Sequence, residues 1–289
     1  MASPLQVHER YDSLAEFAAF ADRYASEYIR TRGSSFSGAT LTEALRMARD
    51  GWPEGAAKAC DMARRLGVVA GGRVLHHEPT MAVEGGELDI GAYVQGVPEC
   101  WIDTVPEYRP ASGGIVRVTI NMAVSAGVGH AAMIARGTAI AGLVSALEVA
   151  GRSAEVVAQI PGGGWGSPGT TIGGDYGHTA DVLAEVTVKR AGEVLNLSEL
   201  TYSVAHPSMY RVLGFSFYDY CSIRRHVRNI GSESAYGKVC HVPAELLGDV
   251  QAPPLHLFSS GAHSEQDALS WIMARLQEQG VEVRDKQEP

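Results

Sequence analysis

The first third of the chain has the periodic apolar pattern of amphipathic helices. Ser13 with Glu16, and Thr40 with Glu43, have the spacing of capping boxes, and apolar residues recur on one face of the segments that follow. We expect a helix after each pair and a third helix that ends near Leu66. From 68 to 113, glycine, proline and single apolar residues alternate, which predicts short strands and loops packed on the rest.

A different pattern begins at residue 114. The β-branched run 115–121 predicts a buried strand, 130–150 has a helical apolar face that ends at Gly151, and 153–160 predicts a second strand. A strand, a helix and a strand in this order favour parallel pairing with a right-handed crossover.

The rest of the chain continues as alternating strands and helices. A glycine-rich loop over 161–178 precedes an alternating strand over 181–190, and a helix over 196–213 is interrupted at Pro207. The segment 215–221 fits either a strand or a buried helix. A strand over 254–259, a helix over 265–279 and a short strand over 281–283 complete the pattern.

Composition excludes several classes of protein. The formal net charge is −9, which argues against general nucleic-acid binding, because phosphate contacts require clustered Lys and Arg. The four cysteines form no CxxC pair. The polar N-terminus has no secretory pattern, and no run of about 18 apolar residues occurs. We therefore expect a cytoplasmic protein that does not enter a membrane.

The order of these elements resembles the von Willebrand factor A fold over about 115–283. The resemblance implies an α/β fold: a mostly parallel, Rossmann-like sheet flanked by helices. It divides the chain into an N-terminal helical and irregular region, 1–113, that packs on the core, and a von Willebrand A-like domain, 114–289. The ligand edge of such a sheet lies at the carboxyl ends of its parallel strands.

The metal motif of that family is only partly present. The resemblance places its Asp-x-Ser-x-Ser motif at Asn121, Ala123 and Ser125, and its later Asp-Gly pair near Ser259 and Ser260. Both carboxylate positions are lost, whereas a hard cation prefers anionic oxygen ligands. We expect no bound cofactor, with Asn121 and Ser125 as weak Mg²⁺ ligands. The segments GAYVQGVPECWID and VRVTINMAVSAGV are also similar to bacterial and bacteriophage proteins without a known activity.

The glycine-rich loop carries the remaining candidate chemistry. Its backbone N–H groups suit a phosphate or a peptide, although a plain connection between strands at the sheet edge is the favoured explanation. It contains no lysine, so it is not a P-loop, and it lacks the dinucleotide fingerprint and the nucleophile elbow. Trp165 is either a partner anchor or a cover for the core.

If the strand tips converge, this loop shares one edge with the degraded motif. The candidate partner- or ligand-binding residues on that edge are Asn121, Ser125, Gly127, Gly163, Trp165, Ser167, Thr170, Asp175, His178, Ser259 and Ser260.

Three functions are compatible with the sequence. The first is a non-enzymatic interaction domain that binds a protein partner at this edge, and the resemblance suggests an ATPase as that partner. The second is a binder or enzyme that acts on a small phosphorylated ligand through the loop 161–178. The third is a structural or assembly protein of a bacteriophage. No pattern predicts a catalytic residue, and the sequence leaves the oligomeric state open.

Overall fold

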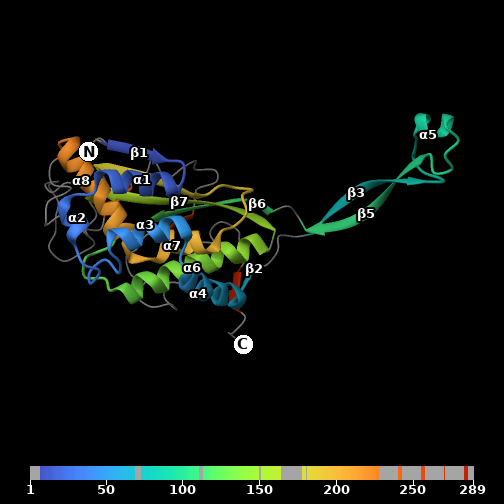
Figure 1. The fold of residues 1–289 in the computed structure, drawn as a ribbon. Coiled ribbons are helices and arrows are strands. Elements are labelled where there is room, and N and C mark those ends of the chain that lie inside the picture. The colour runs from blue at the N-terminus through green and yellow to red at the C-terminus, as the bar shows by residue number, and fades with distance from the viewer. Residues whose placement is uncertain are drawn as a thin grey trace. The chain divides into compact units, whose positions relative to one another are not determined.

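The computed structural model describes residues 7–68, 73–110, 113–149, 151–163, 178–179, 181–227, 240–242, 255–257, 270 and 283–285. The chain divides into two compact units. Met1–Val69 and Ile115–Pro289 form the first unit, and Ala70–Gly114 forms the second. The boundary near 114 separates the two units, and the N-terminal helices fold together with the residues after it (Figure 1).

A five-stranded sheet forms the centre of the first unit, in the order β1-β9-β7-β6-β11. Its strands are β1 (Val7–Tyr11), β6 (Gly113–Asn121), β7 (Arg152–Gly162), β9 (Val182–Lys189) and β11 (Leu255–Leu257). β1 runs parallel to β9, and β11 runs parallel to β6, whereas β9 runs antiparallel to β7. This is a mixed α/β fold with a mostly parallel sheet, as the sequence predicts.

The direction of β7 relative to β6 follows from their adjacency in the sheet and from one hydrogen bond. Met122, just past the end of β6, donates its N–H to the carbonyl of Gln159 at 2.8 Å, near the end of β7. The two strands therefore end together and run in the same direction. The long helix between them, α6 (His130–Val149), supplies the crossover that parallel pairing requires.

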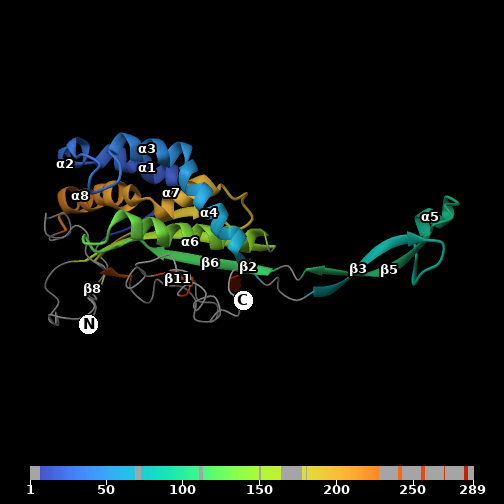
Figure 2. The same ribbon diagram turned by 90° about the horizontal axis from the view of Figure 1, so that it is seen from below.

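The described helices of the first unit lie on one side of this sheet (Figure 2). They are α1 (Leu14–Tyr24), α2 (Glu27–Thr31), α3 (Leu41–Asp50), α4 (Pro53–Arg65), α6, α7 (Leu197–Ala205), the π-helix η1 (Met209–Gly214) and α8 (Phe215–Arg224). Short paired strands complete the unit, β2 (Leu66–Val68) with β12 (Val283–Asp285) and β8 (His178–Thr179) with β10 (Cys240–His241).

Both predicted capping signals are confirmed. The Thr40 hydroxyl accepts the N–H of Glu43, and the Glu43 carboxylate accepts the N–H of Thr40, which forms a complete capping box at the start of α3. Ser13 accepts the N–H of Glu16 at the start of α1 in the same way, although the Glu16 carboxylate bonds to the N–H of Asp12.

α6 is the central helix of the unit, and its neighbours surround it. A Cβ on Gly137 would lie 2.1 Å from the Cα of Ala205 in α7, and one on Gly142 would lie 2.7 Å from the Met62 side chain in α4. Among the described helices, only α6 is long and apolar enough to cross a membrane by length and composition. Its 67% burial accounts for this composition, because a helix enclosed by protein is apolar all round.

The residues 208–219, after Pro207, are buried and helical. η1 follows α7 as six π-helical residues and continues directly into α8, so the segment 215–221 is helix and not strand. Phe215 and Phe217 are fully buried, and Phe20 of α1 packs edge-on against Tyr220 at 5.0 Å. These aromatic contacts bind the N-terminal helices to α8.

The second unit is a long antiparallel hairpin. β3 (Arg73–Ala82) pairs with β5 (Trp101–Pro110) over its whole length, and the two residues of β4 (Glu87–Leu88) add to β5 near the turn. A short helix, α5 (Ile90–Val94), lies in the connection between β4 and β5. The sequence predicts only short strands here, and the structure instead has two strands of ten residues each.

Two further elements differ from the prediction. The third predicted helix ends at Arg65, next to the expected Leu66, but the chain then continues as the unpredicted strand β2, which pairs with β12. β1, with the sequence VHERY, is an edge strand that the sequence pattern does not predict. Val7 and Tyr11 are buried toward the helices, where the Tyr11 ring lies 5.0 Å from Phe17.

Candidate functional site

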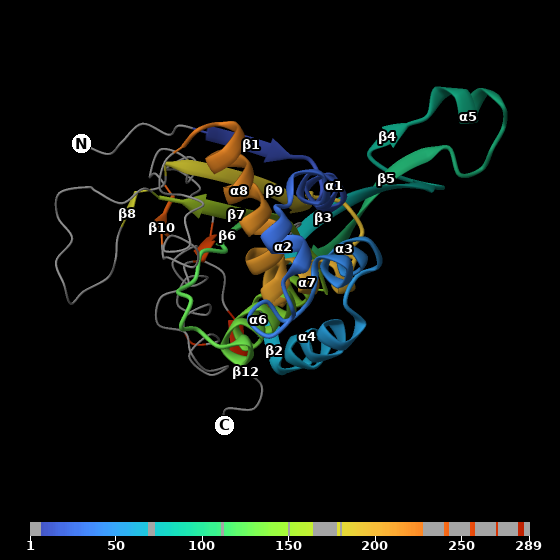
Figure 3. The ribbon, with the colours of Figure 1, turned by 60° about the vertical axis from the view of Figure 1, so that its left-hand side comes forward.

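The carboxyl ends of three neighbouring strands form the predicted edge. β6 lies between β7 and β11, and the three run in the same direction (Figure 3). Leu257 pairs with Ile120, one residue before Asn121, and the hydrogen bond from Met122 to Gln159 brings the end of β7 to the same place. The described ends of these three strands therefore lie side by side at one edge of the sheet, where open α/β sheets bind ligands.

Asn121 holds the loop after β6 in place. Its side chain is fully buried, and its Oδ1 accepts the N–H of Ala123 at 2.9 Å. This bond turns the chain sharply at the end of the strand. Ser125 and Gly127 lie on the exposed part of the same loop, where the Ser125 hydroxyl accepts the N–H of Gly127 at 3.4 Å. Asn121 thus fixes the buried start of the loop, and the residues around Ser125 form its exposed part.

A buried arginine fastens this loop to the helical side of the unit. Arg211 of η1 donates to the carbonyl of Val128 at 2.5 Å and to the carbonyl of Phe36 at 2.9 Å. Its guanidinium also lies 4.3 Å from the centre of the Phe36 ring, and His130 forms a second bond to the same Phe36 carbonyl at 2.9 Å. Burial lowers the pKa of Arg211, although the group stays charged at neutral pH.

The structure describes only some of the other predicted residues. Gly163 is half-buried at the end of β7, and the backbone of His178 belongs to β8, which pairs with β10. The remaining candidates lie outside the described residues: Trp165, Ser167, Thr170, Asp175, Ser259 and Ser260.

A polar cluster on the sheet surface is absent from the sequence-based candidates. Glu185 of β9 accepts hydrogen bonds from Arg10 at 3.0 Å and from Gln159 at 2.9 Å, and His8 lies 2.7 Å from it. Burial raises the pKa of Glu185, and the three donors outweigh it, so that the pKa is lower than usual. The Gln159 Oε1 is buried with no partner in the described part of the chain.

This cluster joins three strands on the face away from the helices. Val7 and Tyr11 point toward the helices, so His8 and Arg10 point the other way. An imidazole beside a carboxylate is also the pair that orients a general base. Among the described contacts of His8, however, there is no hydroxyl or thiol to activate, and the cluster serves to attach the edge strand β1. In the sequence, only the alternating positions of Val, Glu and Tyr in VHERY indicate the strand β1 that carries His8 and Arg10.

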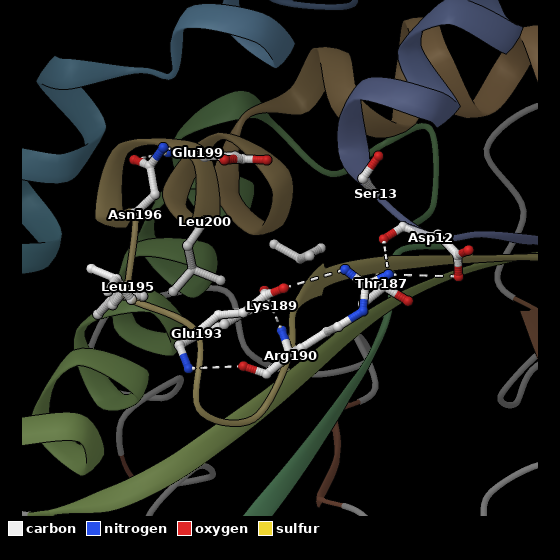
Figure 4. A pocket seen from close by; sticks show the side chains of 12 residues that line it. Asp12, Ser13, Thr187, Lys189, Arg190, Glu193, Leu195, Asn196, Glu199 and Leu200 are labelled. Atoms are coloured by element: carbon white, nitrogen blue, oxygen red, sulfur yellow. Dashed lines mark hydrogen bonds and ion pairs between the residues drawn. The ribbon is translucent and has the colours of Figure 1, made fainter.

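A cavity of about 180 Å³ lies at the opposite end of the sheet (Figure 4). Lys189 is paired with Val156, near the start of β7, whereas Gly162 at the other end is paired with Val182, so this cavity is remote from the edge at Asn121. Its walls come from the ends of β1 and β9 and the start of α7.

The charged groups around the cavity satisfy one another. The Lys189 amine lies 2.7 Å from the Glu148 carboxylate and donates to the Ala154 carbonyl at 3.0 Å. Arg190 lies between Asp12 and Glu193 and forms ion pairs with both. Both cations that line the cavity, Lys189 and Arg190, are thus already paired with carboxylates.

Within the described residues, no three His, Cys, Asp or Glu side chains gather as metal ligands. The buried polar groups instead support the fold. His206 accepts the backbone N–H of Ser208 on Nδ1 and lies 4.9 Å from the Trp52 ring. Burial lowers the pKa of His206 to about 4, so the ring is neutral near pH 7.

The fold and its edge define a class of protein: an α/β protein with a mostly parallel sheet, whose described helices lie on one face, and a structured loop at the carboxyl ends of the strands. The chain belongs to the family described as Domain of unknown function (DUF7192), whose model matches residues 4–280. Comparison with curated proteins and with solved structures gave no match.

Proposed function

We propose that this protein is a non-enzymatic interaction domain of von Willebrand A type. It binds another protein at the edge formed by the carboxyl ends of β6, β7 and β11. The main support is the strand order β9-β7-β6-β11, in which only β9 runs against its neighbour β7. The family that the sequence resembles combines a parallel sheet with one antiparallel edge strand in this way, and here β1 is added outside β9.

Under this proposal, the metal site that is typical of this class has lost its ligands in this chain. Ala123 offers a methyl group where that class has a hydroxyl, and the Oδ1 of Asn121 already accepts the N–H of Ala123. Neither position supplies the anionic oxygen that Mg²⁺ prefers. Recognition then depends on the shape and polarity of the edge, and an ATPase is the partner class that the resemblance suggests.

The loop at this edge suits a protein contact. Its backbone is held by Arg211 and Asn121, while Ser125, Ala126 and Gly127 are exposed. A loop fixed in advance loses little conformational entropy when a partner binds. Surface loops on a rigid sheet are also where binding residues concentrate.

Charges placed in this loop test the proposal. The double variant Ala126→Glu, Gly129→Glu leaves the fold intact, because a Cβ on Gly129 meets nothing within 4 Å and both residues are exposed. We expect the tagged variant to lose a partner that the tagged wild-type chain co-purifies from its native host. Val194→Glu is the matched control, since Val194 is 94% exposed beside the remote cavity. If both variants recover the partner equally well, the edge is not part of the binding site.

A further inference from the structure

The tip of the hairpin unit exposes a group of large apolar side chains. On α5, Ile90 is 70% exposed, Tyr93 is 62% exposed and Val94 is 78% exposed. The spacing of these residues places them on one face of the helix. Val83, in the turn after β3, is 66% exposed as well. Exposed apolar side chains grouped on a structured segment are characteristic of interaction sites.

Hydrogen bonds fix the tip in one shape. Asp89 accepts the N–H of Ala92 on its carboxylate and donates its own N–H to the carbonyl of Cys100 at 2.8 Å. Gly86 donates to the carbonyl of Ile102 at 3.1 Å, and a Cβ on Gly85 would lie 2.5 Å from that same oxygen. The apolar side chains are therefore presented on a preformed backbone, which lowers the entropy lost on binding.

The surroundings of the tip are acidic. No Lys or Arg occurs in the sequence between Arg73 and Arg109. The exposed charged residues near the tip are Glu84, Glu87, Glu99 and Asp103. The surface that fits this tip is accordingly apolar with positive charges at its rim. An anionic lipid surface repels such a tip, which favours a protein as the partner.

The first unit carries a patch with these properties, which we call the α1–α8 patch: Arg23, Tyr24, Tyr220, Ile223 and Arg224. The rings of Tyr24 and Tyr220 lie 4.8 Å apart, and Ile223 is 59% exposed one turn further along α8. Arg23 lies 5.4 Å from the centre of the Tyr24 ring. Arg224 is exposed and has no hydrogen bond or ion pair within the described part of the chain.

We propose that the acidic apolar tip of one molecule docks onto the α1–α8 patch of a second copy of this chain. Ile90 and Val94 then cover Ile223 and the tyrosine rings, while the glutamates meet Arg23 and Arg224. The tip and the patch are different surfaces, so the contact is head-to-tail, and each dimer keeps one free tip and one free patch. This inference does not depend on the proposed function of the sheet edge.

Self-association of the full chain provides the test. In sedimentation velocity at low salt, the mean mass of the wild-type chain rises with concentration, and it falls again at high salt because the rim charges are screened. The tip variant Ile90→Ser, Val94→Ser and the patch variant Ile223→Glu, Arg224→Glu each weaken association by at least about tenfold. Val149→Ser is the matched control, because Val149 is 87% exposed and belongs to neither surface.

Mixing the two variants gives the sharpest result. The tip variant keeps an intact patch and the patch variant keeps an intact tip, so their mixture forms dimers and stops there. A wild-type chain that stays monomeric at every concentration overturns the proposal, as does self-association that both variants retain. Binding to vesicles of zwitterionic and of anionic lipid is tested in parallel. If the wild-type chain binds either kind of vesicle and only the tip variant loses this binding, the tip recognises lipid and the proposal is overturned.

Discussion

Replacing Arg211 with methionine should loosen the loop at the end of β6. The substitution keeps a long side chain in the buried position but removes the two donors to the carbonyls of Phe36 and Val128. His130 still bonds to the Phe36 carbonyl, so Val128 is the group left without this partner. The loss should therefore be concentrated in residues 124–129.

The size of the effect follows from these contacts. A hydrogen bond from a charged donor contributes about 1.5–3 kcal/mol. Two such bonds are lost, and the loss is partly offset because a guanidinium no longer has to be buried. We expect the free energy of unfolding to fall by about 2–4 kcal/mol in Arg211→Met and by about half as much in Arg211→Lys, which keeps one donor group.

Urea denaturation measures the global loss, and amide hydrogen exchange measures the local one. Arg117→Met serves as a control, because Arg117 forms an exposed pair with Glu155 at 3.2 Å and such pairs contribute less than about 1 kcal/mol. Faster exchange over 124–129 in Arg211→Met, but not in Arg117→Met, is the expected result. Exchange that is unchanged in this segment would refute the view that Arg211 fastens the loop.

The buried histidine, the close packing of α6 on α7 and the absence of a bound cofactor can each be tested. The pKa of His206 is about 4 in the folded state and about 6.5 in the unfolded state, so the unfolded state binds more protons between these pH values. The free energy of unfolding should therefore fall by about 3 kcal/mol as the pH drops from 6.5 to 4. Urea titrations at several pH values should show this slope, and His206→Gln should remove it. Gly137→Ala should cost about 1–3 kcal/mol because its Cβ meets the backbone of Ala205, whereas Gly129→Ala should be close to neutral; equal melting temperatures for the two would show that α6 and α7 are not so close. Mg²⁺, Mn²⁺ and nucleotides should leave the Tm unchanged, and a concentration-dependent rise with any of them would favour the ligand-binding alternative.

Local signals in the sequence predict much of the first unit. The capping pair Thr40 and Glu43 predicts the start of α3 because both partners lie within one turn. The alternation over 181–190 predicts β9, and the break at Pro207 separates α7 from η1. In each case the residues that decide the structure are neighbours along the chain.

Long-range contacts explain what the pattern misses. β1 has only Val7 and Tyr11 as buried apolar residues, and its polar side chains are satisfied by Glu185, far along the chain. In the hairpin, Pro79 and Pro106 suggest short strands because proline removes a backbone donor. β3 is an edge strand, and β5 has β4 beside it only at Trp101 and Ile102, so both prolines have an open side for the missing donor.

Long-range contacts also decide which residues are exposed at the predicted edge. The sequence places Asn121 and Ser125 at the end of a strand, but it does not show which of them faces solvent. That depends on the turn at Ala123 and on Arg211, which lies in a separate helical segment. The candidates in the glycine-rich loop and after β11 remain predictions.

Site-specific photo-crosslinking shows whether the edge at the carboxyl ends of β6, β7 and β11 binds a protein partner. A photoreactive phenylalanine at Ala126 lies on the exposed loop of the proposed edge, and the same group at Val194 lies at the remote end of the sheet. After illumination in the native host, we expect a discrete adduct between position 126 and one other protein, and none from position 194. An adduct of the same protein from position 194, with none from 126, would contradict the proposed edge.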